Sequence, residues 1–211
     1  MKKIIMLLIL FPFLAFAQKF DKHEKKLIKS GDINQRLYVI QSDVESELQI
    51  LKSVSKDINP KARDLDILIN RMYLAVTHPI DGGVGIAAPQ VGINRNIIWV
   101  QRFDKVGEPF EVYINPKIVW TSKLMRKGSE GCLSIPNERG SVQRYYTIEI
   151  EYQDRKGKKH SEIIEGFTAV IFQHEIDHLN GVLFTDRLKE QENKLFQFIN
   201  NELGIISAQN F

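Results

Sequence analysis

The stretch GFTAVIFQHEIDHLNG, residues 166–181, decides the plan of this sequence. Its apolar and histidine positions recur at intervals of three and four residues, as on one face of a helix: Phe167, Val170, Ile171, His174 and His178. The pair Asn180-Gly181 is typical of a helix end. Two histidines four residues apart on one face can bind a single metal ion. Glu175, directly after the first histidine, can take the proton of a metal-bound water.

Two histidines need a third ligand to hold a catalytic metal, and that ligand separates the classes of site. A metzincin-type site would have histidine where this sequence has Phe184, so that class is excluded. A thermolysin-type site would take a glutamate from a later helix, which Glu190, Glu192 and Glu202 leave open. Cys132 is the other candidate, and a Cys-His-His set suits Zn²⁺ or Fe²⁺ with one position open for water. A nucleophilic cysteine with a histidine base would leave the second histidine unexplained.

The rest of the chain is predicted to form short helices and short strands. Helices are expected at residues 21–29, at residues 42–53, and from the N-cap pair Asn59-Pro60 to about residue 78. Strands are expected at residues 97–101, 111–114, 118–121, 147–152 and 160–164, the last two as a hairpin around DRKGKK. A last amphipathic helix is expected at residues 186–203. The fold class is therefore α+β, with short antiparallel sheets packed around a central helix that carries HExxH, and a C-terminal helix.

Composition and charge limit the kind of protein this is. The 211 residues are 43% hydrophobic and 26% charged, which is typical of one soluble domain. The net charge of +3 is small and dispersed, so we expect no nucleic-acid partner. Cys132 is the only cysteine, so no intramolecular disulfide can form.

The first 17 residues have the three parts of a secretory signal peptide. Lys2 and Lys3 are followed by an apolar run of 14 residues, from Ile4 to Ala17, that ends in a small-x-small site. The run is shorter than the roughly 20 residues that span a bilayer, so an uncleaved anchor is the lesser alternative. We expect an exported protein that meets the membrane only through this leader.

Three motifs, the last of them within the helix described above, carry a resemblance to a known family. GVGIAAPQ at residues 83–90, EGCLS at residues 130–134 and HEIDHLNG at residues 174–181 stand in the order found in peptide deformylases. The sequence resembles that family over roughly residues 45 to 190. The domain plan that follows is a signal peptide at 1–17, a polar extension at 18–45, a metallohydrolase domain at 46–190, and a C-terminal helix and tail of that domain at 191–211.

The resemblance implies a role for each matching residue. Cys132, His174 and His178 would bind the metal, and Glu175 would act as general base and then as general acid. The side chain of Gln90 and the backbone N–H of Leu133 would bind the oxyanion of the tetrahedral intermediate. The residues expected to contact substrate are Gly83, Val84, Gly85, Glu130, Arg139, Phe167, Val170 and Ile171. Glu130 would also position Gln90 or an arginine such as Arg144, whereas Gln173 is given no role.

The implied activity is removal of the formyl group from formyl-methionyl peptides by a monomeric enzyme with one divalent metal. Family members typically use Fe²⁺ and accept Ni²⁺, Co²⁺ or Zn²⁺. Zinc is an alternative here because an exported thiolate–iron site would face oxidation. Deformylases are cytoplasmic by default, so the leader and the polar extension depart from the family. The turn Gly31-Asp32 is followed by Ile33 where the family has proline. A general metallopeptidase or amidase, and a non-catalytic peptide-binding module, are the competing functions.

We expect the exported chain to begin at Gln18, because cleavage would follow the small residue Ala17. Its net charge would then be +1, since Lys2 and Lys3 are lost (3 − 2 = 1). Cell fractionation followed by mass spectrometry of the intact protein measures both. Recovery in the cytoplasm with residues 1–17 still attached would contradict the prediction.

Overall fold

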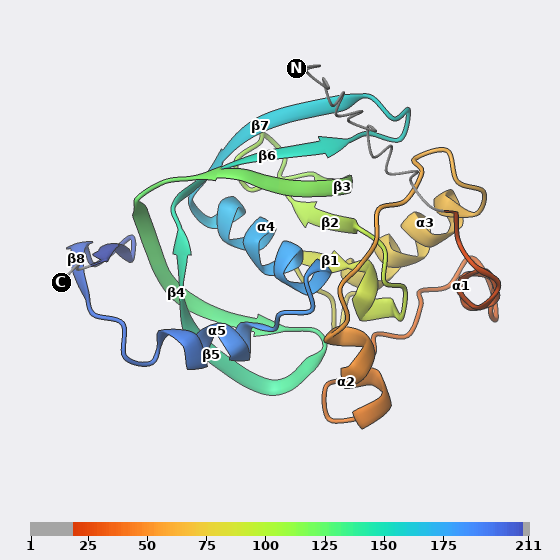
Figure 1. Cartoon of the computed structure of the whole chain (residues 1–211), viewed down its shortest axis with the longest axis horizontal. Helices are drawn as coiled ribbons and strands as arrows, with labels where there is room; N and C mark the ends of the chain where they lie inside the picture. Colours follow the sequence, from red (N-terminus) through yellow and green to blue (C-terminus); the bar gives the residue numbers. More distant parts are fainter. Residues whose placement is uncertain (1–18, 209–211) are drawn as a thin grey trace, which may run out of the picture.

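Two antiparallel sheets and a helix lying against both of them form the framework of the protein (Figure 1). The structure is a computed structural model that describes residues 19–208, so the predicted leader lies outside the described residues. The helices are α1 Lys22–Ile28, α2 Glu45–Leu51, α3 Leu65–Val76, the 3₁₀ helix η1 Ala88–Val91, α4 Gly166–Leu179 and α5 Phe184–Gln191. The strands are β1 Gly85–Ala87, β2 Ile97–Gln101, β3 Phe110–Thr121, β4 Leu124–Cys132, β5 Ile135–Tyr145, β6 Thr147–Gln153, β7 Lys159–Glu165, β8 Phe196–Asn200 and β9 Ile205–Ala208.

Both sheets are antiparallel throughout. The five-stranded sheet has the order β1-β2-β3-β6-β7, and the four-stranded sheet has the order β5-β4-β9-β8. All of their pairings are antiparallel. β1 is an edge of the larger sheet, so the backbone of the glycine motif is not covered by another strand on its outer side. The predicted combination of helices with antiparallel sheets is confirmed.

Helix α4 buries its apolar face against the larger sheet. Ile171, Phe172 and Ile176 pack in one cluster with sheet residues such as Ile148 and Ile150. The helix ends at Leu179. Gly181 follows with a φ of +70°, and a Cβ there would lie 2.3 Å from the carbonyl oxygen of Lys52. Glycine is required because the chain leaves the helix against the α2 segment.

Most of the predicted strands are present, with one change of boundaries. The strands at 97–101, 147–152 and 160–164 appear as β2, β6 and β7. The two strands predicted at 111–114 and 118–121 are one strand, β3, whose pairing with β6 shifts between Ile114 and Lys117. Asn115 at this bulge has a φ of 53°. Pro116 next to it lacks an N–H, as is tolerated at a bulge.

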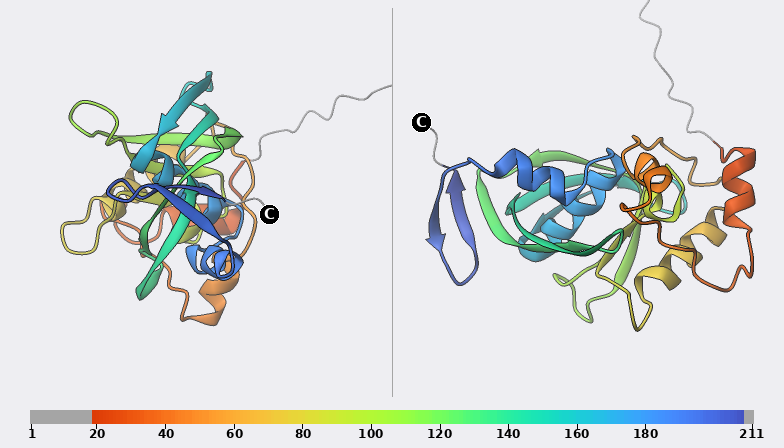
Figure 2. Two further views of the ribbon diagram at one scale, coloured as in Figure 1. Left: turned by 90° about the vertical axis from the view of Figure 1, so that its left-hand side faces the viewer. Right: turned by 90° about the horizontal axis from the view of Figure 1, so that it is seen from below.

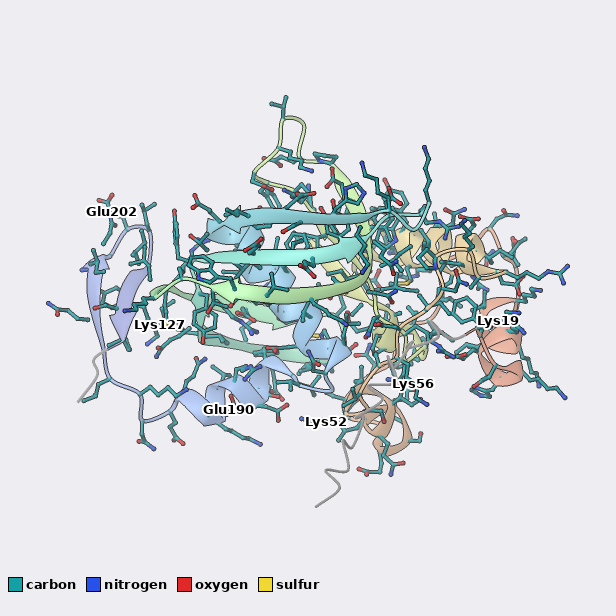
Figure 3. The ribbon with its side chains drawn as sticks, turned by 45° about the horizontal axis from the view of Figure 1, so that its top comes forward. Lys19, Lys52, Lys56, Lys127, Glu190 and Glu202 are labelled. Carbon is teal, nitrogen blue, oxygen red and sulfur yellow. The ribbon has the colours of Figure 1, made fainter. Side chains whose placement is uncertain are left out.

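The predicted C-terminal helix at residues 186–203 is wrong beyond Gln191. Residues 196–208 instead form the hairpin of β8 and β9, and β9 pairs with β4 through Met125 and Ile206. Figure 2 shows this hairpin at the opposite end of the molecule from α1. In Figure 3 that end of the molecule is marked by Lys127 on β4 and by Glu202 between β8 and β9. The apolar spacing suits either structure, and the open edge of β4 decides for the strand because it supplies backbone partners.

The predicted helix start at Asn59-Pro60 also needs correction. The pair Asn59-Pro60 forms a turn, in which Asn59 Oδ1 accepts from the N–H of Lys61, and α3 begins only at Leu65. The polar stretch before residue 45 contributes Phe20, Ile28 and Leu37 to the buried core. Among residues 19–208 no helix has the length and apolar character needed to cross a bilayer.

We expect Asn115→Ala to lower the free energy of unfolding by about 2–4 kcal/mol. Asn115 Oδ1 accepts from the N–H of Ile58 at 2.9 Å, and Nδ2 donates to the carbonyl of Ile58 at 2.9 Å and to Gln153 at 2.7 Å. The alanine would leave buried backbone groups without partners and would also strain the positive φ. Urea denaturation measures the change, with the exposed Asn34→Ala as the control. Equal unfolding midpoints for the two variants would contradict the prediction.

Candidate functional site

Cys132 completes the cluster that the two histidines of α4 begin. The sulfur of Cys132, at the end of β4, and the ring nitrogens of His174 and His178 all lie within 4.8 Å of one another. The sulfur is 3.2 Å from His178 Nε2. The alternative third ligands are not in this cluster, and Glu190 instead accepts from Arg187 at 2.8 Å. One thiolate and two imidazoles around a common point are a donor set that fits a divalent metal such as Zn²⁺ or Fe²⁺.

Hydrogen bonding determines which ring nitrogen of His174 faces the cluster. Its Nδ1 lies 2.8 Å from Glu130 Oε2, so Nε2 is the atom available to a metal. Glu130 is 7% exposed and also accepts from Arg144 at 2.8 and 2.9 Å. Burial by itself would raise the pKa of Glu130, but the hydrogen bonds from Arg144 and His174 outweigh it and lower the pKa to about 2. The carboxylate is therefore charged and can orient the imidazole.

Arg144 joins the two strands of the cysteine hairpin to α4. From β5 it contacts Glu130 on β4 and Asp177 on α4, and all three residues are buried. Arg187 on α5 donates to Asp177 at 2.6 and 3.0 Å. Neither Asp177 nor Arg187 was expected from the sequence. An aspartate between the two histidines of a buried helix was the signal that could have indicated them, because a buried carboxylate requires a cationic partner.

Glu175 is buried with few polar neighbours. It is 4% exposed, and its Oε2 has no hydrogen-bond partner within residues 19–208. Burial raises the pKa of Glu175 to about 7. A Cβ on Gly85 would lie 2.5 Å from Glu175 Oε1, so the close approach that requires glycine at this position is to Glu175. A carboxyl with a pKa near 7 suits a group that takes up and releases a proton at neutral pH.

Gln90 directs its amide N–H groups toward the cysteine. Its Oε1 accepts from the N–H of Ala87 at 2.8 Å, while Nε2 lies 3.5 Å from Cys132 Sγ and 3.3 Å from Ser134 Oγ. The side chain is 1% exposed and stands on η1, directly after β1. Glu130 therefore does not position Gln90, which the sequence had left open; it contacts Arg144 and His174 instead. Leu133 follows Cys132 in the turn between β4 and β5, and its carbonyl accepts from Gln41 at 3.1 Å.

One cavity of about 560 Å³ brings the predicted site residues together. His178 does not line the cavity and is 1% exposed. The other predicted site residues all line it: Gly83, Val84, Gly85, Gln90, Glu130, Cys132, Leu133, Arg139, Phe167, Val170, Ile171, His174 and Glu175. Its size is in the range of pockets that enclose small ligands. Ser129 and residues 136–138 also line it and were not predicted.

Gln173, which was given no role, connects α4 to β5. Its Oε1 accepts from the N–H of Tyr145 and its Nε2 donates to the carbonyl of Tyr145, both at 2.9 Å. The same Nε2 donates to the carbonyl of Ala169 at 2.9 Å. The side chain of Gln173 therefore forms the two hydrogen bonds with the backbone of Tyr145 that a neighbouring strand would otherwise form. It fixes the helix beside the strand that carries Arg144.

Comparison with known proteins agrees with this geometry. The sequence model of the family described as polypeptide deformylase matches residues 40–194, which is more than half of the chain. The chain belongs to the peptide deformylase family. Peptide deformylases are hydrolases, and the match includes every residue of the cavity described above.

Individual relatives are similar over the same part of the chain. The peptide deformylase of Symbiobacterium thermophilum is 43% identical over 152 residues, which are 72% of this chain and 66% of that protein. That of Leptospira biflexa is 38% identical over 159 residues, which are 71% of this chain and 87% of that protein. A crystal structure of the Acinetobacter baumannii peptide deformylase with Met-Ala-Ser bound has a TM-score of 0.64 and 35% identity, and covers 72% of this chain and 98% of that one.

We expect Arg144→Leu to lower the free energy of unfolding by about 3–5 kcal/mol, because Glu130 would be left as a buried carboxylate without its cation. Chemical denaturation followed by circular dichroism measures the loss. Arg139→Leu is the matched control, since Arg139 is exposed at the rim of the same cavity. A loss below about 1 kcal/mol in Arg144→Leu would show that the network does not carry this part of the fold.

Proposed function

We propose that this protein hydrolyses the N-formyl group of formyl-methionyl peptides and releases formate. The observation that carries the proposal is the cluster of Cys132, His174 and His178 at a cavity that Glu175 and Gln90 also line and that has an apolar wall. The family membership supports the reaction class. The bound Met-Ala-Ser in the Acinetobacter baumannii protein supports the substrate class, because that tripeptide is what deformylation of formyl-Met-Ala-Ser would leave.

A divalent metal would be held by Cys132, His174 and His178. When bound, it supplies Lewis acidity toward water and toward a carbonyl oxygen. Glu130 would keep His174 oriented as a ligand, and burial, which lowers the pKa of His178, keeps that imidazole neutral as ligation requires. Peptide deformylases are metal-dependent, and we propose Fe²⁺ as the native metal, with Zn²⁺ or Ni²⁺ as alternatives.

The residues around the metal position divide the work of formamide hydrolysis. Water adds to the formyl carbon, and Glu175 takes its proton. The Nε2 group of Gln90 and the N–H of Leu133 would donate to the oxygen that becomes negative, an effect worth about 3 kcal/mol for one donor in other enzymes. Glu175 then returns the proton to the nitrogen as the carbon–nitrogen bond breaks. The products are formate and a peptide with a free amino group.

The cavity also explains how a peptide would be positioned. Val84 from the glycine motif and Phe167, Val170 and Ile171 from α4 form an apolar wall that can take the methionine side chain. The open edge of β1 offers backbone groups to an extended peptide, in the manner of an added strand. Arg139 at the rim can contact the peptide beyond the methionine.

We further propose that the enzyme acts outside the cytoplasm, as a monomer, on formylated peptide fragments. Residues 1–17 motivate the location, and the site residues all come from one chain, so a second copy is not needed to complete the site. The proposed domain plan keeps the leader, the extension and the catalytic domain as the sequence indicated. The fractionation experiment above tests the location independently of the chemistry.

Protein that lacks residues 1–17 should release formate from formyl-Met-Ala-Ser, and Glu175→Gln should lower kcat/KM by about 10²–10⁴-fold while the metal content stays near wild type. Cys132→Ala should instead lose most of its metal, because one of three ligands is removed. Formate release and elemental analysis of the same samples measure both effects. Glu138→Gln, an exposed carboxylate on the same cavity, is the control and should retain activity.

The competing functions predict other outcomes of that assay. A general amidase would also cleave acetyl-Met-Ala-Ser or internal peptide bonds. A non-catalytic peptide-binding module would release no formate with Fe²⁺, Ni²⁺ or Zn²⁺. Either result would overturn the proposed function.

A further inference from the structure

A second cavity, of about 820 Å³, adjoins the cavity of the candidate site. The two share Gly82 and Leu133, and Leu133 is one of the two proposed oxyanion donors. The walls of the second cavity come from residues 34–39 and Gln41, from the end of α3 and from the loop that follows it. We call it the Tyr38 groove, after the most exposed apolar side chain among its lining residues.

Much of the groove wall lies outside the part of the chain that matches the family. The match begins at residue 40, whereas the wall begins at Asn34. The wall is nevertheless held firmly by a buried arginine of α3. Arg71 is 4% exposed, and it donates from Nε to the carbonyl of Gln35 at 2.8 Å and from Nη1 to the carbonyl of Ser30 at 2.8 Å. A surface fixed in this way needs little ordering when a ligand binds.

Direct hydrogen bonds connect the wall to the reacting part of the site. The N–H of Ile40 donates to the carbonyl of Gln90 at 2.9 Å. Gln41 donates from Nε2 to the carbonyls of Val39 at 2.8 Å and Leu133 at 3.1 Å. The segment that lines the groove therefore also supports both proposed oxyanion donors. On the outer side, Arg36 pairs with Asp81 in the loop after α3.

Both apolar and polar side chains line the groove. Tyr38 is 64% exposed and Leu74 is 38% exposed, and Val39 and Leu133 lie beside them. Large apolar side chains that are exposed next to a cavity indicate a binding surface. Among the titratable side chains that line the groove, Asp81 pairs with both Arg36 and His78. The chemistry therefore suits an uncharged aromatic or large aliphatic side chain.

We propose that the Tyr38 groove binds the side chain of the residue that follows methionine in the formylated peptide, and that it selects aromatic and large aliphatic residues there. The inference rests on the proposed function and narrows its substrate class. In an extended peptide successive side chains point to opposite sides. With methionine against the α4 wall, the next side chain would point away from α4. The groove adjoins the methionine cavity at Gly82 and Leu133, so it would receive that side chain.

Two peptides of equal composition, formyl-Met-Phe-Gly and formyl-Met-Gly-Phe, test the proposal. Wild-type protein should prefer the first by about tenfold in kcat/KM, the effect of burying part of one aromatic ring. Tyr38→Ala should reduce this ratio to near one, and Tyr38→Phe should retain it because the ring remains. Tyr145→Ala, which changes an exposed tyrosine that lines neither cavity, should leave the ratio as in wild type.

Equal kcat/KM values for the two peptides in wild-type protein would overturn the proposal while leaving the proposed function intact. A preference that survives in Tyr38→Ala would overturn it as well. If neither peptide releases formate, the proposed function fails, and titration calorimetry with Met-Phe-Gly and Met-Gly-Phe still decides the groove. Tighter binding of Met-Phe-Gly, weakened in Tyr38→Ala, would support it, and equal affinities would reject it.

Discussion

The buried guanidinium of Arg144 is the interaction on which this structure depends most. It stands on β5 and contacts Glu130 on β4 and Asp177 on α4, so a single cation joins the hairpin that carries Cys132 to the helix that carries both histidines. None of the three charges is stable alone in a low-dielectric interior. The four-stranded sheet and α4 must therefore meet in the one arrangement in which these charges are paired. That arrangement is also the one that brings sulfur and imidazole nitrogens together.

The same network adjusts the chemistry of neighbouring groups in opposite directions. Glu130, surrounded by donors, is held as a charged acceptor for His174, whereas Glu175 one residue further along α4 has burial without comparable donors. These two carboxylates line the same cavity but would have different tasks. Glu130 would orient a metal ligand, and Glu175 would move a proton. Their environments, and not their residue type, make the difference.

The N-terminal part of the chain has become part of the site. Phe20, Ile28 and Leu37 are buried in the core, Arg71 binds the carbonyls of this segment, and Ile40 reaches the backbone of Gln90. In the sequence this region looked like a polar addition because its buried positions are few and widely spaced. Its residues line the cavity that adjoins the candidate site. Under the proposed function, this segment would influence peptide specificity without touching the reacting residues.

The sequence by itself determined the features that depend on local periodicity and on residue type: helix α4 with its two histidines and glutamate, the β6–β7 hairpin, the residue types for a metal site, and, as a prediction still to be tested, the leader. Helical and alternating patterns are visible locally because the residues that form them are close in the chain. Only the tertiary structure decided what depends on distant partners. The segment after Gln191 forms a hairpin because its strand β9 pairs with the edge of β4. Cys132 lies beside the histidines because Arg144 pairs with buried carboxylates on both β4 and α4. Pairing of edges and compensation of buried charge join residues far apart in sequence, and no local pattern records them.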